Sequence, residues 1–157
     1  MKNLNKKQII TLTKIIEPFL MVDSIKDILS LKSGTGIKKI KEDSWFFKCH
    51  FINEPMMPGT LIEEAMLQTI VSILYSSKKF KNKICLITST KTNFYSKVNK
   101  PTNLNIDIKI LKITKLKVET IAIVKDDKNI KIASGAYNYF ISKKWKKKIQ
   151  IKFNINH

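Results

Sequence analysis

The chain has 157 residues, of which 43% are apolar, and this is sufficient for one domain with its own core. Two cysteines cannot build a disulfide framework and fit a reducing compartment, and no apolar run reaches the 18 residues that a membrane span needs. The N-terminal apolar stretch is interrupted by Lys14 and Glu17 before any cleavage site, so a signal peptide is not expected. The sequence therefore predicts a cytoplasmic protein without a membrane span.

The charge of the chain is strongly positive and unevenly distributed. The formal net charge is +18, and all 30 basic residues are lysine. Arginine is the residue best suited to bidentate recognition of phosphates and bases, so its absence argues against a protein that reads nucleic-acid sequence. Residues 1–76 carry 10 lysines against 8 acidic residues, or +2, whereas residues 77–157 carry 20 against 4, or +16. Such a field steers acidic macromolecules, and we expect an acidic partner.

The first half of the chain mixes one helix with extended segments. Helical spacing of Ile9, Leu12, Ile15 and Ile16 predicts an amphipathic helix over residues 6–16, and Pro18 stops it. The segments that follow are expected as extended chain at 19–25 and 29–41, with a turn or bulge at 33–36, an extended aromatic segment at 45–51, and a loop at 52–59.

The second half predicts a buried helix followed by a sheet. Residues 61–77 are apolar almost all round, which is typical of a buried helix. After Lys83 the apolar residues alternate, and this predicts four long strands, at 84–95, 104–114, 116–125 and 130–141. Long strands with short connections form an antiparallel meander, so we expect an α+β domain over residues 1–141, with the sheet wrapped around the helix. Residues 142–157 form a basic extension with a candidate added strand. Its Lys143–Lys148 run with Trp145 is either a solvated tail or a site for phosphates or an anionic membrane surface.

Histidine is rare in this chain, which narrows the choice of a general base. Only His50 and the terminal His157 are present, so a base working near neutral pH would be His50. The alternative is a histidine at the edge of the core whose ring bonds to a backbone carbonyl. Cys49 invites a thiol nucleophile or a metal site, but adjacent strand residues point to opposite faces and no further ligand pair exists. We expect no metal and no nucleotide-binding loop.

The start of the buried helix combines a glycine with two carboxylates. Thr60 and Glu63 have the spacing of a capping box, which gives Glu63 a structural role. Glu64 either complements the helix dipole from solvent or is a desolvated acid that can donate a proton. Gly59 lets a ligand approach its backbone amide at the positive helix end. With His50 as the base, these groups describe proton abstraction beside a carbonyl followed by loss of a leaving group.

Residues 50–68 read His-Phe-Ile-Asn-Glu-Pro-Met-Met-Pro-Gly-Thr-Leu-Ile-Glu-Glu-Ala-Met-Leu-Gln. This segment resembles the signature of the β-hydroxyacyl–acyl carrier protein dehydratases, His-Phe-Pro-x-x-Pro-x-Met-Pro-Gly-x-Leu-x-x-Glu-Ala-Met-x-Gln. Residues 18–23 resemble the family's N-terminal Pro-Phe-Leu-Leu-Val-Asp segment, and residues 95–101 resemble the strand and turn that line the acyl tunnel. The resemblance covers about residues 10–141.

The resemblance implies a hot-dog fold that works as a homodimer with shared active sites, or as a trimer of such dimers. His50 of one subunit would be the base, Glu64 of the other the acid, and the Gly59 amide would hold the thioester carbonyl. The implied reaction is dehydration of a (3R)-hydroxyacyl group on acyl carrier protein to the trans-2-enoyl product, in fatty-acid or related acyl-chain biosynthesis. The implied enzyme is a hydro-lyase without a cofactor beyond the phosphopantetheine of its acidic carrier protein. The residues expected to bind the acyl group are Gly59, Phe51, Met56, Met57, Pro58, Met66, Phe94 and Tyr95.

Four positions depart from the family pattern. Ile52 replaces a proline, Glu54 a frequent histidine, Thr102 a glycine, and Glu63 an aliphatic residue. The adjacent carboxylates Glu63 and Glu64 raise each other's pKa by repulsion, which suits an acid. A glutamate rather than an aspartate at the acid position favours dehydration without isomerisation. The alternatives are a hot-dog acyl thioesterase and a non-catalytic basic binding module.

Overall fold

The structure is a computed structural model, and it describes residues 2–142. The elements, in chain order, are β1 (Lys2–Asn5), α1 (Lys6–Thr13), β2 (Ser24–Leu29), β3 (Ser33–Ile40), the 3-10 helix η1 (Trp45–Lys48), α2 (Gly59–Tyr75), the 3-10 helix η2 (Lys78–Phe80), β4 (Ile84–Phe94), β5 (Thr102–Ile113), β6 (Lys117–Lys125) and β7 (Lys131–Ser142). The strands form one sheet in the order β1-β2-β3-β5-β6-β7-β4, and every neighbouring pair is antiparallel.

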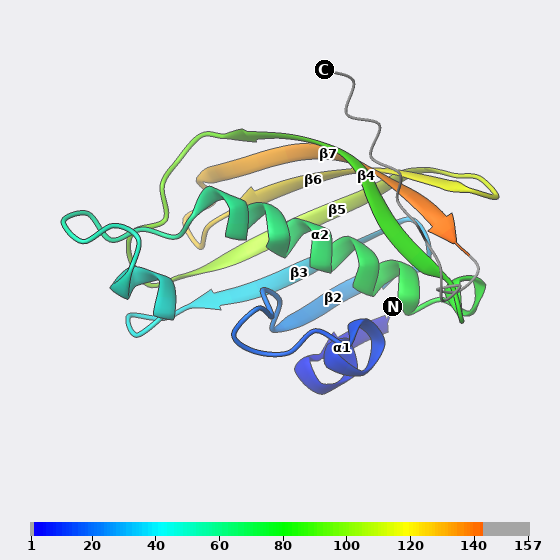
Figure 1. The fold of residues 1–157 in the computed structure, drawn as a ribbon, viewed down its shortest axis with the longest axis horizontal. Coiled ribbons are helices and arrows are strands. Elements are labelled where there is room, and N and C mark those ends of the chain that lie inside the picture. Colours follow the sequence, from blue (N-terminus) through cyan, green and yellow to red (C-terminus); the bar gives the residue numbers. More distant parts are fainter. Residues whose placement is uncertain (1, 143–157) are drawn as a thin grey trace, which may run out of the picture.

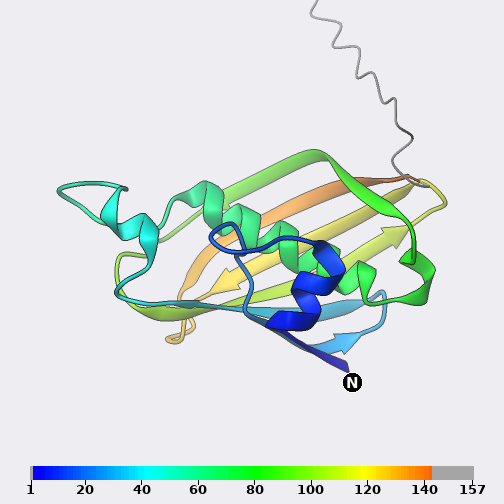
Figure 2. The ribbon, with the colours of Figure 1, turned by 60° about the horizontal axis from the view of Figure 1, so that its bottom comes forward.

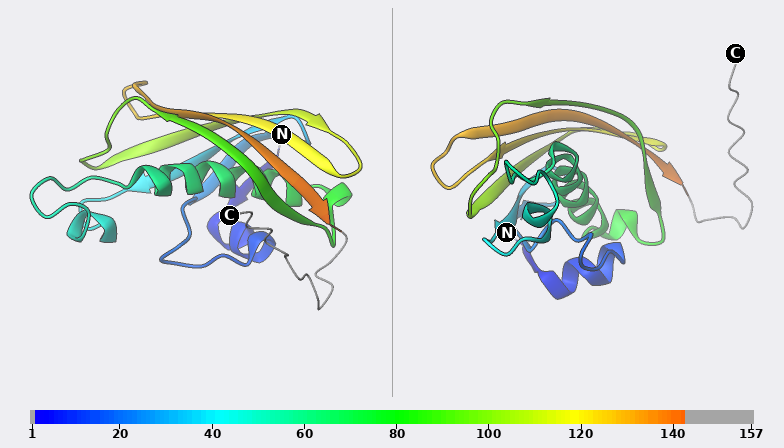
Figure 3. Two further views of the ribbon diagram at one scale, coloured as in Figure 1. Left: turned by 45° about the horizontal axis from the view of Figure 1, so that its top comes forward. Right: turned by 60° about the vertical axis from the view of Figure 1, so that its left-hand side comes forward.

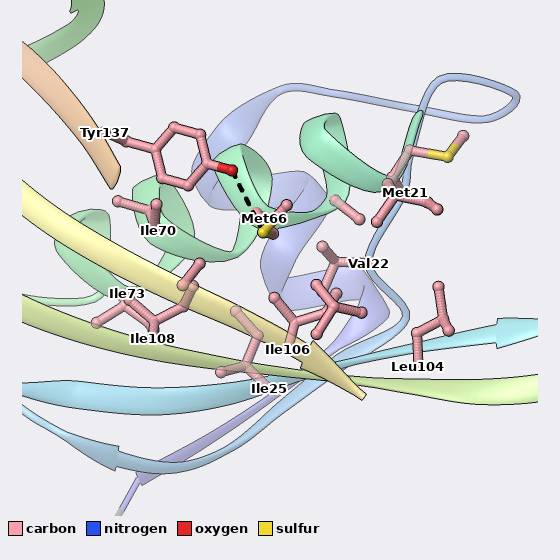
Figure 4. Packing of buried hydrophobic residues seen from close by; sticks show 14 of the residues in the cluster. Met21, Val22, Ile25, Met66, Ile70, Ile73, Leu104, Ile106, Ile108 and Tyr137 are labelled. Atoms are coloured by element: carbon pink, nitrogen blue, oxygen red, sulfur yellow. Dashed lines mark hydrogen bonds between the residues drawn. The ribbon is translucent and has the colours of Figure 1, made fainter. Parts of the chain in front are cut away.

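The sheet curves around α2, as the alternating and all-apolar patterns predict. Figure 1 shows α2 lying along the concave face of the sheet, and Figure 3 shows the strands bending over it, with α1 beside α2 on the open side. The helix buries most of its circumference, including Ile70 and Ile73, while β5 buries Leu104, Ile106 and Ile108 on alternate positions. Figure 4 shows these side chains meeting between helix and sheet. Burial of this apolar surface holds the two layers together.

The four long strands are confirmed, with ends that differ by no more than two residues from those expected. The predicted meander holds for β5, β6 and β7, but β4 pairs with β7 instead of β5. The turn in the first half of the chain lies elsewhere than expected. It occupies residues 30–32, where the Lys32 amide donates to the Leu29 carbonyl oxygen at 2.9 Å, and the glycines at 34 and 36 lie inside β3. A Cβ at Gly36 would lie 2.4 Å from Thr69 Oγ1, so this glycine lets α2 approach the sheet closely.

The aromatic segment at 45–51 is not extended, contrary to expectation. Trp45–Lys48 forms a 3-10 helix whose edge-to-face rings bury Phe46, and the chain turns after it. The loop between this short helix and α2 projects beyond the end of the sheet (Figure 2). Aromatic residues favour strands only when neighbouring strands cover them, and here local ring packing prevails.

The N-terminal helix is shorter than predicted and follows a strand that the sequence did not indicate. Asn5 and Gln8 form a capping box at its start, and Lys14 closes it with a φ of 63°. The basic extension, including the candidate strand at 149–155, lies outside the described residues apart from Ser142, which ends β7. Within the described part of the chain, no helix is long and apolar enough to span a membrane.

Candidate active site

Glu64 lies on the second turn of α2 and faces a groove of about 320 Å³. The groove runs along α2 and is bordered by residues of β4, β7 and the segment after α1, among them Leu67, Val71, Leu86 and Ile87. Burial of the carboxyl raises the pKa of Glu64, the hydrogen bond from Gln68 opposes this, and the charge of Glu63 adds to it. A carboxyl in this setting favours the protonated form that a general acid needs.

Gln68 is the site residue that sequence reasoning did not single out. Its side chain is 1% exposed, and its Nε2 donates to Glu64 Oε1 at 2.9 Å and to the Phe19 carbonyl oxygen at 2.8 Å. Its Oε1 accepts from the Met21 amide at 2.8 Å. One side chain therefore orients the carboxyl and fastens the loop after α1 to α2. The signal was available, because a glutamine four residues after Glu64 lies on the same helix face.

The capping box predicted for Thr60 and Glu63 is absent. Pro58 is the N-cap of α2, with no side-chain capping bond, and its carbonyl oxygen accepts from the amides of Leu61 and Ile62. Glu63 instead accepts a hydrogen bond from Thr92 Oγ1 on β4, at 2.8 Å. The proline before the helix has already fixed the turn that a capping threonine would make, which leaves Glu63 free to reach the neighbouring strand.

His50 lies in the turn after η1 and is partly buried. Its Nδ1 lies 3.0 Å from the Met56 carbonyl oxygen, and its ring packs against Phe51 with centroids 3.7 Å apart. A carbonyl oxygen only accepts, so this contact favours the neutral tautomer with the proton on Nδ1, in which Nε2 carries the lone pair. The backbone contact proposed for a merely structural histidine is present, and it also sets the tautomer that a base requires.

Gly59 opens a second groove, of about 300 Å³, at the start of α2. Five of the residues expected to bind the acyl group line it, namely Met56, Met57, Gly59, Phe94 and Tyr95. A Cβ on Gly59 would lie 3.1 Å from the Phe94 ring, so the glycine lets that ring close over the helix end. No described residue accepts a hydrogen bond from the Gly59 amide, which is available to a ligand.

The walls of this second groove are held by contacts between its two loops. The Met57 amide donates to the Val98 carbonyl oxygen at 2.8 Å, and Glu54 forms an ion pair with Lys97. Tyr95 bonds through its hydroxyl to Ser134 at 2.9 Å, with the Lys131 ammonium 4.1 Å from its ring centroid. Glu54, one of the departures from the family pattern, therefore helps to shape the groove.

The other expected binding residues lie apart from this groove. Pro58 is the N-cap of α2, and Phe51 is exposed beside His50. Met66 is fully buried in the core, where its sulfur accepts a hydrogen bond from Tyr137 at 3.3 Å (Figure 4). Within one chain, Glu64 and Gly59 line different grooves. Among residues 2–142, no cluster of three or more His, Cys, Asp or Glu side chains could hold a metal ion.

Comparison with known proteins identifies the family. The profile of the FabA-like domain matches residues 16–133. The chain belongs to the FabA-like dehydratase family. A relative from Clostridium botulinum (strain Okra / Type B1), named 3-hydroxyacyl-acyl-carrier-protein dehydratase FabZ, is 38% identical over 97 residues, covering 61% of this chain and 67% of the relative. A protein of the same name from Thermoanaerobacter sp. (strain X514) is 34% identical over 113 residues, covering 70% and 80%. The resemblance carried by residues 50–68 is thereby confirmed.

Solved structures show that this FabA-like chain has the expected α+β hot-dog fold. A structure of smu.793 from Streptococcus mutans UA159 bound to acetyl CoA has a TM-score of 0.63 and 13% identity, covering 83% of this chain and 96% of the other. A hypothetical thioesterase with coenzyme A from Streptococcus pneumoniae TIGR4 has a TM-score of 0.59 and 8% identity, covering 75% and 84%. At these identities the likeness concerns the fold alone.

Proposed function

We propose that this chain dehydrates (3R)-hydroxyacyl groups on acyl carrier protein to trans-2-enoyl groups, with His50 as base and Glu64 as acid. The chain is a hydro-lyase of fatty-acid or related acyl-chain biosynthesis. The observation that carries the proposed mechanism is the Glu64 carboxyl, which lies half-buried in an apolar groove with a raised pKa and is oriented by Gln68. A protonated carboxyl in such a groove is suited to protonating a departing hydroxyl group.

The reaction follows from the atoms that each residue presents. The free Nε2 of His50 takes the proton from the carbon next to the thioester carbonyl. The Gly59 amide donates to the carbonyl oxygen, where negative charge develops as the enolate forms. The enolate electrons then form the carbon–carbon double bond as the carbon–oxygen bond breaks, and Glu64 gives its proton to the hydroxyl, which leaves as water. Water then carries the proton that His50 has gained to the Glu64 carboxylate, and both residues are back in their starting forms.

A homodimer would bring the two grooves together. In the described sheet β4 is the last strand, paired only with β7, so its other edge is free to pair with a second β4. The Glu64 groove borders the first half of β4, at Cys85, Leu86 and Ile87, and the Gly59 groove borders its end, at Phe94. Antiparallel pairing of two such edges sets the first half of one strand beside the second half of the other. This geometry supports an active site in which one subunit supplies Glu64 and its partner supplies His50 and Gly59.

The distribution of lysines supports an acidic carrier as the partner. A groove of about 660 Å³ at the end of α2 is lined by Lys14, Lys78, Lys81 and Lys83, and it shares Thr13 and Tyr75 with the Glu64 groove. A basic surface beside the site attracts an acidic protein and the phosphate of its phosphopantetheine arm. We expect the enzyme to work in the cytoplasm and to use no resident cofactor, because the acyl group arrives already activated as a thioester.

Turnover of a hydroxyacyl carrier-protein substrate tests the reaction. The purified chain should form the trans-2-enoyl product without releasing free thiol, whereas a thioesterase would release thiol and a binding module would do neither. His50→Ala and Glu64→Gln should each abolish turnover while keeping the wild-type circular dichroism, and the exposed Glu42→Gln variant should keep full activity. Near-normal rates in either site variant would refute the mechanism.

Mixing the two inactive variants tests the shared site. After unfolding and refolding together, half of the dimers are heterodimers, and each of these has one site with both His50 and Glu64. About a quarter of the wild-type activity should return. The control mixes wild type with the His50→Ala/Glu64→Gln double variant. In each heterodimer of this mixture, both sites lack either His50 or Glu64. The wild-type chains should therefore retain about half of their activity. If the mixture of single variants stays inactive, both groups act within one subunit.

A further inference from the structure

Glu63 departs from the family pattern, and the structure places it at the end of a hydrogen-bonded chain. Thr92 Oγ1 donates to Glu63 Oε1 at 2.8 Å and lies 2.9 Å from the Tyr137 hydroxyl. Thr92 has one proton to donate and uses it on the carboxylate, so Tyr137 is the donor when it bonds to Thr92. That hydroxyl also lies 3.3 Å from the sulfur of Met66. The chain runs from the core, through β7 and β4, to the carboxylate of Glu63.

These contacts fix the position of the Glu63 carboxylate. Hydroxyl groups that donate to a carboxylate stabilise its charge. Tyr137 remains a neutral donor because burial raises its pKa to about 12. The ion pairs of the described chain involve Glu17, Asp23 and Glu54 but no lysine at Glu63. The Glu63 carboxylate is therefore held by one neutral donor, Thr92, and no lysine of residues 2–142 forms an ion pair with it.

The described groups that line the groove around Glu64 carry no charge, so Glu63 is the charged neighbour that acts on Glu64. From α2 the groove presents Gln68 and Tyr75, from β4 Cys85, and from β7 Tyr139, while the end of α1 and the segment after it present Thr13 and Ile15. Burial raises the pKa of Cys85 to about 12 and also raises those of the two tyrosines, so all three are neutral near pH 7. Within residues 2–142, no lysine lines this groove. Because its surroundings are neutral and apolar, repulsion from Glu63 is weakly screened.

We infer that Glu63, held in place by Thr92, is a fixed negative charge that keeps the neighbouring acid Glu64 in its protonated, proton-donating form. Glu63 is thus a positioning residue that acts through Glu64, and the inference rests on the proposed role of Glu64 as the acid. An aliphatic residue at this position supplies no such charge. The chain therefore has its own means of keeping the acid protonated at higher pH.

The test compares Glu63→Gln with wild type across pH. The glutamine carbonyl can still accept the hydrogen bond from Thr92, so the variant removes the charge and keeps the contact. We expect the alkaline limb of the kcat/KM profile to move to lower pH, with the rate at acidic pH retained. Each unit of displacement corresponds to about a tenfold loss of kcat/KM at a fixed pH above the limb. Thr92→Val should move the limb in the same direction by less, and the distant Glu42→Gln should not move it.

A direct titration separates this inference from the proposed mechanism. In the free protein, the side-chain carboxyl carbon of Glu64, followed by NMR with labelled glutamate, should titrate at lower pH in Glu63→Gln than in wild type. An unchanged titration and an unchanged limb in that variant overturn the inference even if Glu64→Gln is inactive. If the alkaline limb of the kcat/KM profile lies at the same pH in Thr92→Val as in wild type, the role of Thr92 is overturned. Wild-type turnover in Glu64→Gln would refute the role of Glu64 as the acid. The titration would still show whether Glu63 raises the pKa of Glu64.

Discussion

Replacing Gln68 by leucine tests whether one buried amide holds the loop after α1 to the catalytic helix. The Met21 amide, on a residue that is 1% exposed, loses its acceptor, and an unsatisfied buried group costs roughly 1–3 kcal/mol. The Phe19 carbonyl oxygen also loses its donor, but Phe19 is 52% exposed, so water can replace that bond at little cost. Leucine matches the volume closely, and no large cavity adds to the penalty.

We therefore expect Gln68→Leu to lower the free energy of unfolding by about 1–3 kcal/mol. With a urea slope of about 2 kcal/mol per molar, the unfolding midpoint falls by roughly 0.5 to 1.5 M. The assay is urea unfolding followed by circular dichroism at one fixed protein concentration, because a dimer gains stability with concentration.

Gln8→Leu is the matched control for this measurement. Gln8 also accepts from a backbone amide, that of Asn5, but it is exposed, and water replaces the lost bond. The urea unfolding midpoint of Gln8→Leu should fall by less than half as much as that of Gln68→Leu. Equal midpoints for Gln68→Leu and wild type, or equal losses in the two variants, would show that the buried amide does not hold the loop.

Three further variants test the site and the core packing of β7. The pKa of Glu64 is higher in the folded state than its ordinary value of 4.5 in the unfolded chain. Protonated Glu64 therefore stabilises the fold at low pH, and this contribution is lost as the pH rises above 4.5 and through the pKa of the folded state. Glu64→Gln should consequently raise the urea midpoint relative to wild type at pH 7 but not at pH 4; a gain at both pH values would point to packing instead. Gly135→Ala would place a Cβ 2.2 Å from the Tyr137 hydroxyl, and thermal unfolding should show a loss of about 1–3 kcal/mol, part of which returns in the double variant with Tyr137→Phe. In Gly59→Ala the added Cβ would lie 3.1 Å from the Phe94 ring and push the ring aside. The value of kcat/KM should fall by up to about 100-fold without a change in the unfolding midpoint. Full activity would mean that the site tolerates a displaced ring.

The regular elements were predictable because their signals repeat along the chain. In β5, Leu104, Ile106 and Ile108 alternate with polar residues, and this alternation by itself predicts the strand and the face that it buries. The apolar surface of α2 likewise predicted a helix enclosed by the sheet. The motif at residues 50–68 named the family, and with it the fold.

The contacts of single polar side chains were not predictable in this way. The local pattern assigned Glu63 to a cap with Thr60, whereas the folded chain offers it Thr92, which is 29 residues away. The glycines of β3 looked like a turn, and they are the points where α2 comes close to the sheet. Both errors arose from interpreting locally a residue whose neighbour is set by packing.

The sequence alone determined the long helix α2, the four strands β4 to β7 and the faces that they bury, because burial energy is summed over many periodically spaced residues. The motif at residues 50–68 determined the family. Only the tertiary structure decided that Gln68 orients Glu64, that Thr92 holds Glu63, and that Glu64 and Gly59 open into separate grooves along β4. A hydrogen bond depends on distances near 3 Å between atoms far apart in the chain, and such distances exist only after helix and sheet have packed.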